Sequence, residues 1–238
     1  AIVEIVEGVF SDEPKPDFQT AIDEQVQIAR KRWAATKKKL NERSQIPTRT
    51  DRICRTEVQL GGFGGQGIVS AGRIIGQAAT IYDKLEACFT QSYGPEARGG
   101  AAGSQVVIAS DPIHHPHLIE PTNAIIMSQE AYTKYAPKLA TGATLLIDDG
   151  LVTLSPDHRQ DLKNYGVPAT QIAEELGNSR AANTVMLGLW TAIIGAVSKS
   201  AMQRSVADAV PPKTIEVNLN AFEAGFKKGL RYQGSNAL

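Results

Sequence analysis

The sequence predicts an α/β protein: a three-layer α/β/α, Rossmann-like domain around a mostly parallel sheet, preceded by an N-terminal extension that contains a helix. Two observations predict this class. Short apolar segments alternate with amphipathic segments of helical period from residue 56 onward, and a glycine-rich turn joins the first strand to the first helix. Strands and helices in this alternation are typical of a parallel sheet covered on both faces, which binds ligands at the carboxyl ends of its strands.

The individual elements follow from this alternation. The predicted strands span residues 56–60, 86–89, 104–109, 124–127 and 143–147. The predicted helices span residues 66–82, 129–139, 171–176, 180–197, 200–210 and 213–232. The helix over 180–197 is apolar almost all round, and we therefore expect it to be buried.

Residues 54–238 are expected to form this domain, and residues 1–53 an N-terminal extension. In the extension, Ile22, Val26 and Trp33 recur at helical spacing, and basic residues dominate its second half. A solvated helix whose two ends differ in charge is one interpretation. However, a helix with an apolar stripe and no core of its own must pack on something, which favours an arm that docks on a partner subunit.

The composition fits one sizeable core and excludes several classes of function. The 238 residues are 42% hydrophobic and carry a formal net charge of +0, so nothing suggests binding to nucleic acid or to a membrane surface. Cys54 and Cys88 are the two cysteines, which is too few for a disulfide framework or for the ligand set of an iron–sulfur cluster. No apolar run has the length of a membrane span and no signal-peptide pattern is visible, so a cytoplasmic protein is expected.

The glycine-rich turn is the first candidate for a binding site. Gly62, Gly64 and Gly67 fit the spacing G-x-G-x-x-G between a strand and a helix. Without side chains the backbone can turn tightly, and a phosphate can approach the amides at the helix N-terminus. By itself the spacing fits close packing of a helix on a sheet equally well.

A dinucleotide site needs one further residue, an acid at the end of the second strand that binds the ribose hydroxyls. The predicted second strand ends in Phe89 and Thr90, whereas Asp83 and Glu86 lie before it or at its beginning. This placement counts against NAD and FAD and leaves other phosphate-bearing ligands open.

A second glycine-rich loop, over residues 91–103, is expected to reach the same edge of the sheet. Its phrase Glu96-Ala-Arg-Gly99, together with Gly64-Gly-Gln-Gly67 and Asn183-Thr-Val-Met-Leu-Gly188, resembles the gamma subunit, or gamma domain, of the 2-oxoacid:ferredoxin oxidoreductases. The resemblance covers about three quarters of the chain. The phrase from Gln91 to Gly100 is most similar to the 2-oxoglutarate branch of this family.

The resemblance implies an enzyme subunit that has no catalytic residues of its own and is inactive alone. Enzymes of this family cleave a 2-oxoacid with thiamine diphosphate, pass electrons through iron–sulfur clusters to ferredoxin, and release CO2 and an acyl-coenzyme A. Thiamine diphosphate, magnesium and the clusters belong to partner subunits. The implied partners are alpha and beta subunits, a ferredoxin-like subunit, and ferredoxin or another electron acceptor.

Other substrates and other classes stay open at this point. Within the family, the alternatives to 2-oxoglutarate are an aromatic 2-oxoacid such as phenylglyoxylate or indolepyruvate, pyruvate, and a branched-chain 2-oxoacid. Outside it, the alternatives are a stand-alone NAD- or FAD-binding protein and a purely structural subunit.

The resemblance also implies that coenzyme A binds at the two loops. The implied binding residues are Gly62, Gly64, Gly65, Gln66 and Gly67 in the first loop and Ser92, Tyr93, Glu96 and Arg98 in the second. Arg98 offers a planar fork of donors for a phosphate or carboxylate, and Glu96 can orient it. An internal Glu96–Arg98 pair that stiffens an interface, and Tyr93 as a lid over the sheet edge, are the structural alternatives.

The remaining polar candidates are expected to be structural. No metal is expected at His114, His115 and His117, because prolines keep this segment irregular and neither a cysteine nor a carboxylate completes a site nearby. The Asp-Asp-Gly sequence at residues 148–150 is typical of a turn. Asn183, near a helix start, is expected to cap or to bind local backbone.

Overall fold

In a computed structural model of the chain, the structure describes residues 53, 55–93 and 101–235, with backbone alone at Ser92, Tyr93, Ala101 and Ser235. The expected docking arm therefore lies outside the described residues, apart from Ile53. So do Glu96 and Arg98 of the second loop. The division of the chain at residues 53 and 54 stays a prediction.

A six-stranded sheet in the order β2-β3-β1-β4-β5-β6 organises the described residues. The strands are β1 (Thr56–Phe63), β2 (Glu86–Tyr93), β3 (Ala101–Ala109), β4 (Asn123–Ile126), β5 (Thr144–Asp148) and β6 (Lys163–Val167). β3 is antiparallel to both of its neighbours, whereas β1, β4, β5 and β6 pair in parallel. Every strand except β3 thus runs in one direction, which confirms the mostly parallel sheet.

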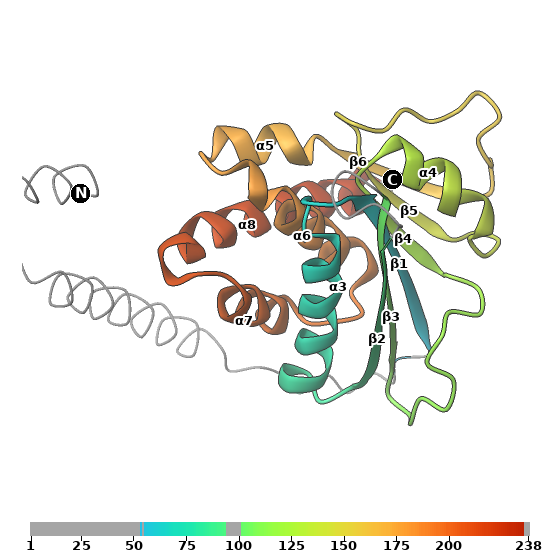
Figure 1. Cartoon of the computed structure of the whole chain (residues 1–238), viewed down its shortest axis with the longest axis horizontal. Coiled ribbons are helices and arrows are strands. Elements are labelled where there is room, and N and C mark those ends of the chain that lie inside the picture. Colours follow the sequence, from blue (N-terminus) through green and yellow to red (C-terminus); the bar gives the residue numbers. More distant parts are fainter. Residues whose placement is uncertain (1–52, 54, 94–100, 236–238) are drawn as a thin grey trace, which may run out of the picture. The chain divides into compact units, whose positions relative to one another are not determined.

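Helices cover the two faces of this sheet unequally (Figure 1). The helices are α3 (Ile68–Gln77), α4 (Gln129–Tyr135), α5 (Ala169–Glu175), α6 (Ala182–Ile194), α7 (Lys199–Ala209) and α8 (Ile215–Ser235). All of them except α4 share one hydrophobic core, into which β1 directs Val58 and Leu60. α4 forms a smaller core on the opposite face with Ala124, Ile126 and Leu145 of β4 and β5. The predicted α/β/α arrangement is therefore confirmed, with a thin second helical layer.

α6 is the buried helix that its apolar composition predicts. Its residues from Ala182 to Ala192 are all buried. The Trp190 side chain is fully buried, and its indole nitrogen donates to Asn123 Oδ1 at 2.6 Å, which ties the helix to the first residue of β4. A buried indole N–H needs such an acceptor, so this bond fixes the position of α6 along the sheet.

The backbones of α6 and α8 are in direct contact. A Cβ added at Gly225 of α8 would lie 1.9 Å from the Val185 carbonyl oxygen, and one at Gly188 of α6 would lie 2.1 Å from the Phe222 carbonyl oxygen. Only a hydrogen atom fits at these two positions. The two helices consequently pack more closely than helices with side chains at their crossing can.

The structure corrects some predicted boundaries. β1 continues through Gly61 and Gly62, because these residues pair with Gly103 and Ala102 of β3. The Tyr135 ring of α4 occupies the place that a side chain of Gly61 would take, 2.7 Å from its ideal Cβ. β6 was not predicted, since its first residues Lys163 and Asn164 are exposed and only Val167 is fully buried. The first helix begins at Ile68 and ends in a π-helical turn, Ala78–Tyr82.

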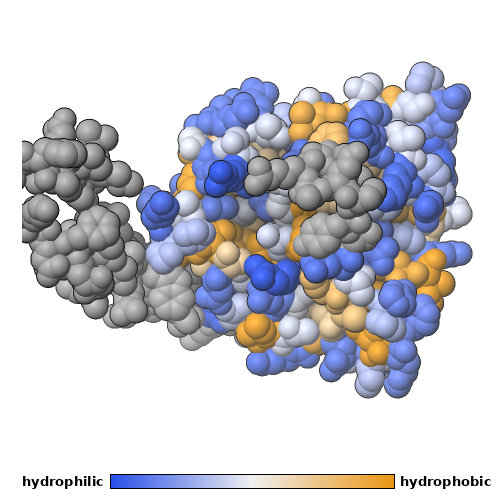
Figure 2. Space-filling model, in the orientation of Figure 1, coloured by the Kyte–Doolittle hydropathy of each residue, from blue (hydrophilic) through white to orange (hydrophobic). Residues whose placement is uncertain are grey.

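The described surface is of mixed polarity. Apolar and polar residues alternate over the face seen in Figure 2, and the exposed large apolar side chains Ile81, Ile119, Leu151 and Leu230 come from separate parts of the chain. Among the described helices, none is both long enough and apolar enough to cross a bilayer.

Replacing Gly225 with alanine tests the contact between α6 and α8. The added methyl group would force the two helices apart, and we expect the free energy of unfolding to fall by about 2 kcal/mol, as in over-packed cores. Gly234→Ala is the matched control in the same helix, because a Cβ there meets nothing within 4 Å. Urea denaturation measures both variants, and equal stabilities would show that the backbones are not in contact.

Candidate functional site

The glycine-rich loop lies where the chain changes direction along the sheet. From β1 the chain crosses by α3 to β2 on one side, and from the adjacent β4 it crosses by α4 to β5 on the other side. α3 and α4 lie on opposite faces of the sheet. In open α/β sheets, ligands bind outside the carboxyl ends of the strands at such a switch point.

Gln66 connects the two strands at this point. Its side-chain Oε1 accepts from the Phe63 amide at 2.7 Å, and its Nε2 donates to the Met127 carbonyl oxygen at 2.9 Å. One amide group thus closes the loop after β1 and ties it to the residue that follows β4. Of the predicted binding residues, Gln66 is therefore occupied with shaping the loop.

Two of the loop glycines make room for other side chains. A Cβ at Gly62 would lie 2.5 Å from Gln66 Oε1, and one at Gly67 would lie 2.3 Å from Asn183 Nδ2. The Asn183 amide donates to the Gly67 carbonyl oxygen at 3.2 Å. Asn183 therefore binds backbone, but backbone distant in sequence, so the expectation of a helix cap or a local partner is wrong. The bond places the first turn of α6 against the start of α3.

The other two glycines face outward. Gly64 and Gly65 are exposed, and Gly65 has φ 101 with nothing within 4 Å of its ideal Cβ. The adjacent α3 begins at Ile68 with no side-chain cap and no acidic residue in its first turn. Backbone amides at a helix N-terminus attract anions, so an approaching phosphate group finds both space and a favourable field here.

The second loop starts and ends beside the first. Phe63, the last residue of β1, pairs with Ala101 of β3, and Ala102 pairs with Tyr93 of β2. The expectation that both loops reach the same edge is confirmed for the backbone that flanks the second loop. The structure does not test the roles predicted for Ser92, Tyr93, Glu96 and Arg98, whose side chains lie outside its description.

The order of the strands argues against a dinucleotide site. In a classical dinucleotide fold the second strand lies directly beside the first, and its terminal acid reaches the ribose. Here β3 lies between β1 and β2. The residue types and the strand order therefore both point away from NAD and FAD.

The Asp-Asp-Gly sequence is a turn with a structural role. Asp148 is fully buried, and its carboxylate accepts from the amides of Ala169 and Thr170 at 3.1 and 3.0 Å and from the Thr170 hydroxyl at 2.6 Å. It thereby holds the start of α5. Burial raises the pKa of the neighbouring Asp149 carboxyl, the charge of Asp148 raises it further, and Lys228 partly offsets both effects.

The histidine cluster is a surface feature. His114, His115 and His117 are exposed, and His115 Nδ1 lies 3.2 Å from the carbonyl oxygen of His117. Within the described ranges no three His, Cys, Asp or Glu residues are grouped so that they could hold a metal ion.

Comparison with known proteins decides the family. The family model for pyruvate ferredoxin/flavodoxin oxidoreductase matches residues 57–228. The chain belongs to this family. Its strands except for Thr56, its glycine loop and α6 lie within the matched range, and the resemblance to the gamma subunits of 2-oxoacid:ferredoxin oxidoreductases is confirmed.

Relatives within the pyruvate ferredoxin/flavodoxin oxidoreductase family cover about three quarters of the chain. The 2-oxoglutarate synthase subunit KorC of Methanocaldococcus jannaschii is 47% identical over 174 residues, which are 73% of this chain and 93% of the relative. The crystal structure of a keto/oxoacid ferredoxin oxidoreductase gamma subunit from Geobacter sulfurreducens matches with a TM-score of 0.66 and 38% identity, over 74% of this chain and 99% of that one.

A third match shows the fold alone. The 2-oxoglutarate:ferredoxin oxidoreductase of Magnetococcus marinus, solved with 2-oxoglutarate, coenzyme A and succinyl-CoA bound, has a TM-score of 0.69 but 24% identity. The match covers 74% of this chain and 31% of that one. The same fold therefore occurs there as part of a longer chain.

Gln66→Glu tests how the loop of this oxidoreductase subunit is held. The substitution keeps the shape of the side chain but places a carboxylate oxygen against the Met127 carbonyl oxygen, so we expect the free energy of unfolding to fall by about 1–3 kcal/mol. Amide exchange at residues 63–67 should become faster. Gln160→Glu, which adds the same charge at an exposed position, is the control. Unchanged stability and exchange in Gln66→Glu would contradict this role.

Proposed function

We propose that the chain is the gamma subunit of a thiamine-diphosphate-dependent 2-oxoacid:ferredoxin oxidoreductase that converts 2-oxoglutarate and coenzyme A to an acyl-coenzyme A and CO2. The observation that carries the proposal is the 47% identity to a 2-oxoglutarate synthase subunit over 93% of its length. Such a match extends through the whole domain and is not limited to the glycine-rich motifs.

The chemistry of oxidation belongs to partner chains in this proposal. A four-cysteine cluster needs more thiolates than Cys54 and Cys88 supply. The polar groups near the switch point, Gln66 and Asn183, are held by backbone and have no proton-transfer chemistry of their own. This chain contributes binding surface, and the alpha, beta and ferredoxin-like subunits contribute the cofactors.

Coenzyme A is the ligand that the glycine loop suits. Its phosphates are anions, and the loop combines outward-facing glycines with the uncapped start of α3. Gly64 and Gly65 let a phosphate approach the backbone, while Gly62, Gln66 and Gly67 hold the loop in shape. From the second loop, Arg98 would bind a phosphate or carboxylate, with Glu96, Ser92 and Tyr93 beside it.

The N-terminal extension has a place in the same proposal. Residues 1–53 precede the range that the family model matches, so the domain shared with the relatives does not include them. Their apolar stripe, with Trp33, suits an interface with a partner subunit.

Assay of the assembled complex tests the function. We expect coenzyme A-dependent reduction of a viologen dye, with a kcat/KM for 2-oxoglutarate at least about tenfold above those for pyruvate, 2-oxoisovalerate, phenylglyoxylate and indolepyruvate. The isolated chain should be inactive with all of them. A preference for another 2-oxoacid would assign the chain to that branch, and activity of the chain alone would contradict the role of a non-catalytic subunit.

A substitution at Gly65 tests the coenzyme A site. A side chain at position 65 would stand where the phosphate is proposed to approach, and the backbone there has φ 101, which residues other than glycine rarely adopt. We therefore expect Gly65→Ala to raise the KM for coenzyme A about tenfold, equivalent to about 1.4 kcal/mol, with little change in the KM for the 2-oxoacid. Gly142→Ala is the matched control. Gly142 also has positive φ, 71, and open space around it, but it precedes β5 at the other end of the sheet. Equal KM values for coenzyme A in both variants would show that the loop does not contact this ligand.

A further inference from the structure

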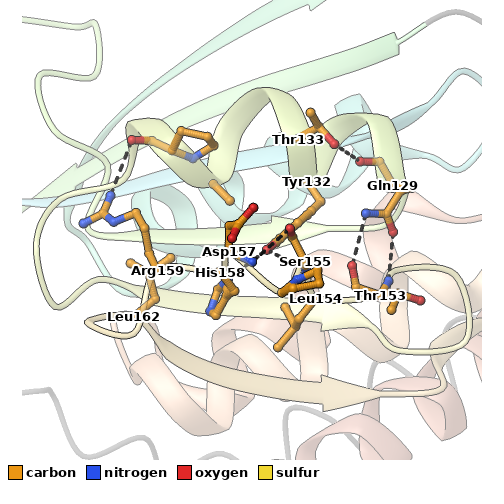
Figure 3. A pocket seen from close by; sticks show the side chains of 13 residues that line it. Gln129, Tyr132, Thr133, Thr153, Leu154, Ser155, Asp157, His158, Arg159 and Leu162 are labelled. Atoms are coloured by element: carbon orange, nitrogen blue, oxygen red, sulfur yellow. Dashed lines mark hydrogen bonds between the residues drawn. The ribbon is translucent and has the colours of Figure 1, made fainter.

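A cavity of about 610 Å³ lies on the outer side of α4, away from the glycine loop. One wall is formed by α4 and the short helix Ala136–Lys138, and the other by the segment 153–162 that connects β5 to β6 (Figure 3). Ligand sites for small molecules have volumes of roughly 300–1,000 Å³. All of the residues that line this cavity belong to the described part of the chain.

Hydrogen bonds hold the connecting segment over the cavity at both ends. At one end, the Thr153 amide donates to Gln129 Oε1 at 2.8 Å, and Gln129 Nε2 donates to the Thr153 carbonyl oxygen at 3.1 Å (Figure 3). At the other end, Arg159 donates to the carbonyl oxygen of Leu139 at 2.6 Å. Because both ends are fixed to the α4 layer, the segment spans the hollow and does not collapse into it.

The walls of the cavity are mainly apolar. The connecting segment contributes Leu154, Pro156 and Leu162 to the lining, and the helical wall contributes Ala136 and Pro137. An apolar enclosure of this kind gains free energy when the body of a ligand replaces water. The ligand should therefore have an aromatic or aliphatic body.

Among the described residues that line the cavity, no free positive charge is present for an anion. The Arg159 guanidinium forms a two-pronged pair with Asp161, at 3.0 and 2.5 Å, in addition to its bonds with main-chain carbonyls. This pair lowers the pKa of the Asp161 carboxyl to about 2, so the pair stays ionised and internally neutral at physiological pH. Asp157 adds an exposed carboxylate to the lining, which disfavours anionic ligands further.

One polar group of the lining has a hydrogen-bond donor to spare. The Asn164 amide nitrogen lies 2.7 Å from His158 Nε2, and since an amide nitrogen only donates, Nε2 accepts and the proton of the neutral ring sits on Nδ1. Nδ1 then donates to the Tyr132 hydroxyl oxygen at 2.8 Å, and the Ser155 amide donates to the same oxygen at 3.3 Å. Among the described residues, the hydroxyl proton of Tyr132 meets no acceptor.

We propose that this cavity is a binding site for an uncharged small molecule with an apolar ring and a carbonyl oxygen, which accepts the hydroxyl proton of Tyr132. The apolar walls hold the ring, the Tyr132 hydroxyl recognises the oxygen, and the neutral Arg159–Asp161 pair and Asp157 exclude anions. The site is separate from the glycine loop, and it stands whether or not the loop binds coenzyme A.

Titration of the full-length chain with three probes, followed by amide NMR shifts, tests the proposal. Acetophenone carries the ring and the carbonyl oxygen, ethylbenzene lacks the oxygen, and benzoate adds a negative charge. We expect acetophenone to shift the amides of residues 153–158 saturably and to bind about three- to tenfold more tightly than ethylbenzene, the value of one neutral hydrogen bond, with benzoate weakest. No saturable shift with any probe, or tightest binding of benzoate, would overturn the proposal.

Variants of α4 separate the hydroxyl from the cavity itself. Tyr132→Phe should reduce acetophenone binding to the level of ethylbenzene, whereas Tyr135→Phe, which removes a hydroxyl that lies against Gly103 of β3 and does not line the cavity, should leave the preference unchanged. Thr133→Trp places an indole at the exposed edge of the cavity and should weaken both neutral probes. A preference that persists in Tyr132→Phe, or full affinity in Thr133→Trp, would show that the probes bind elsewhere.

Discussion

The contact between α6 and α8 is the constraint on which the placement of the candidate site depends. Gly188 and Gly225 bring the two backbones together, and Trp190 ties α6 to Asn123 at the start of β4. A buried helix held from both sides has no freedom to slide. Its first turn therefore comes to lie at the glycine loop, where the Asn183 amide binds the Gly67 carbonyl oxygen. The contact between α6 and α8, although it lies far from the loop, therefore helps to determine the conformation of the loop.

The glycines of the loop are not equivalent, although the motif G-x-G-x-x-G treats them alike. Gly62 and Gly67 are needed inside the protein, because the side chains of Gln66 and Asn183 occupy the places of their missing Cβ atoms. Gly64 and Gly65 are exposed, so in our proposal they are the positions at which coenzyme A would meet backbone. Close packing thus explains Gly62 and Gly67, and anion binding is our proposal for Gly64 and Gly65.

Much of the fold follows from local sequence, and the exceptions have physical reasons. Every residue of β4 is buried, and so is every residue of β5 from Leu145 onward. Such strands are mainly apolar, so composition alone indicates them. β6 was not predicted, because it is short and its first residues are exposed. The glycine motif was visible, but its partners were not: Met127 and Asn183 are distant in sequence from the loop and meet it only through the fold. A period of apolar residues carries no information on such contacts between distant segments.

α4 has a different task on each of its sides. On the inner side, Ala131 and Tyr135 pack against Gly61 of β1, one residue before Gly62 of the glycine loop. On the outer side, Tyr132 and Ala136 line the cavity under the connecting segment. The helix begins at Gln129, directly after Ser128, whose hydroxyl oxygen caps it by accepting from the Ala131 amide.

Met127, the residue before this cap, accepts the hydrogen bond from the Gln66 side chain at its carbonyl oxygen. The same short helix therefore supports the loop at the switch point and walls the second cavity. Its side chains divide by helical period between the two sites, so the inner and outer faces can be altered separately.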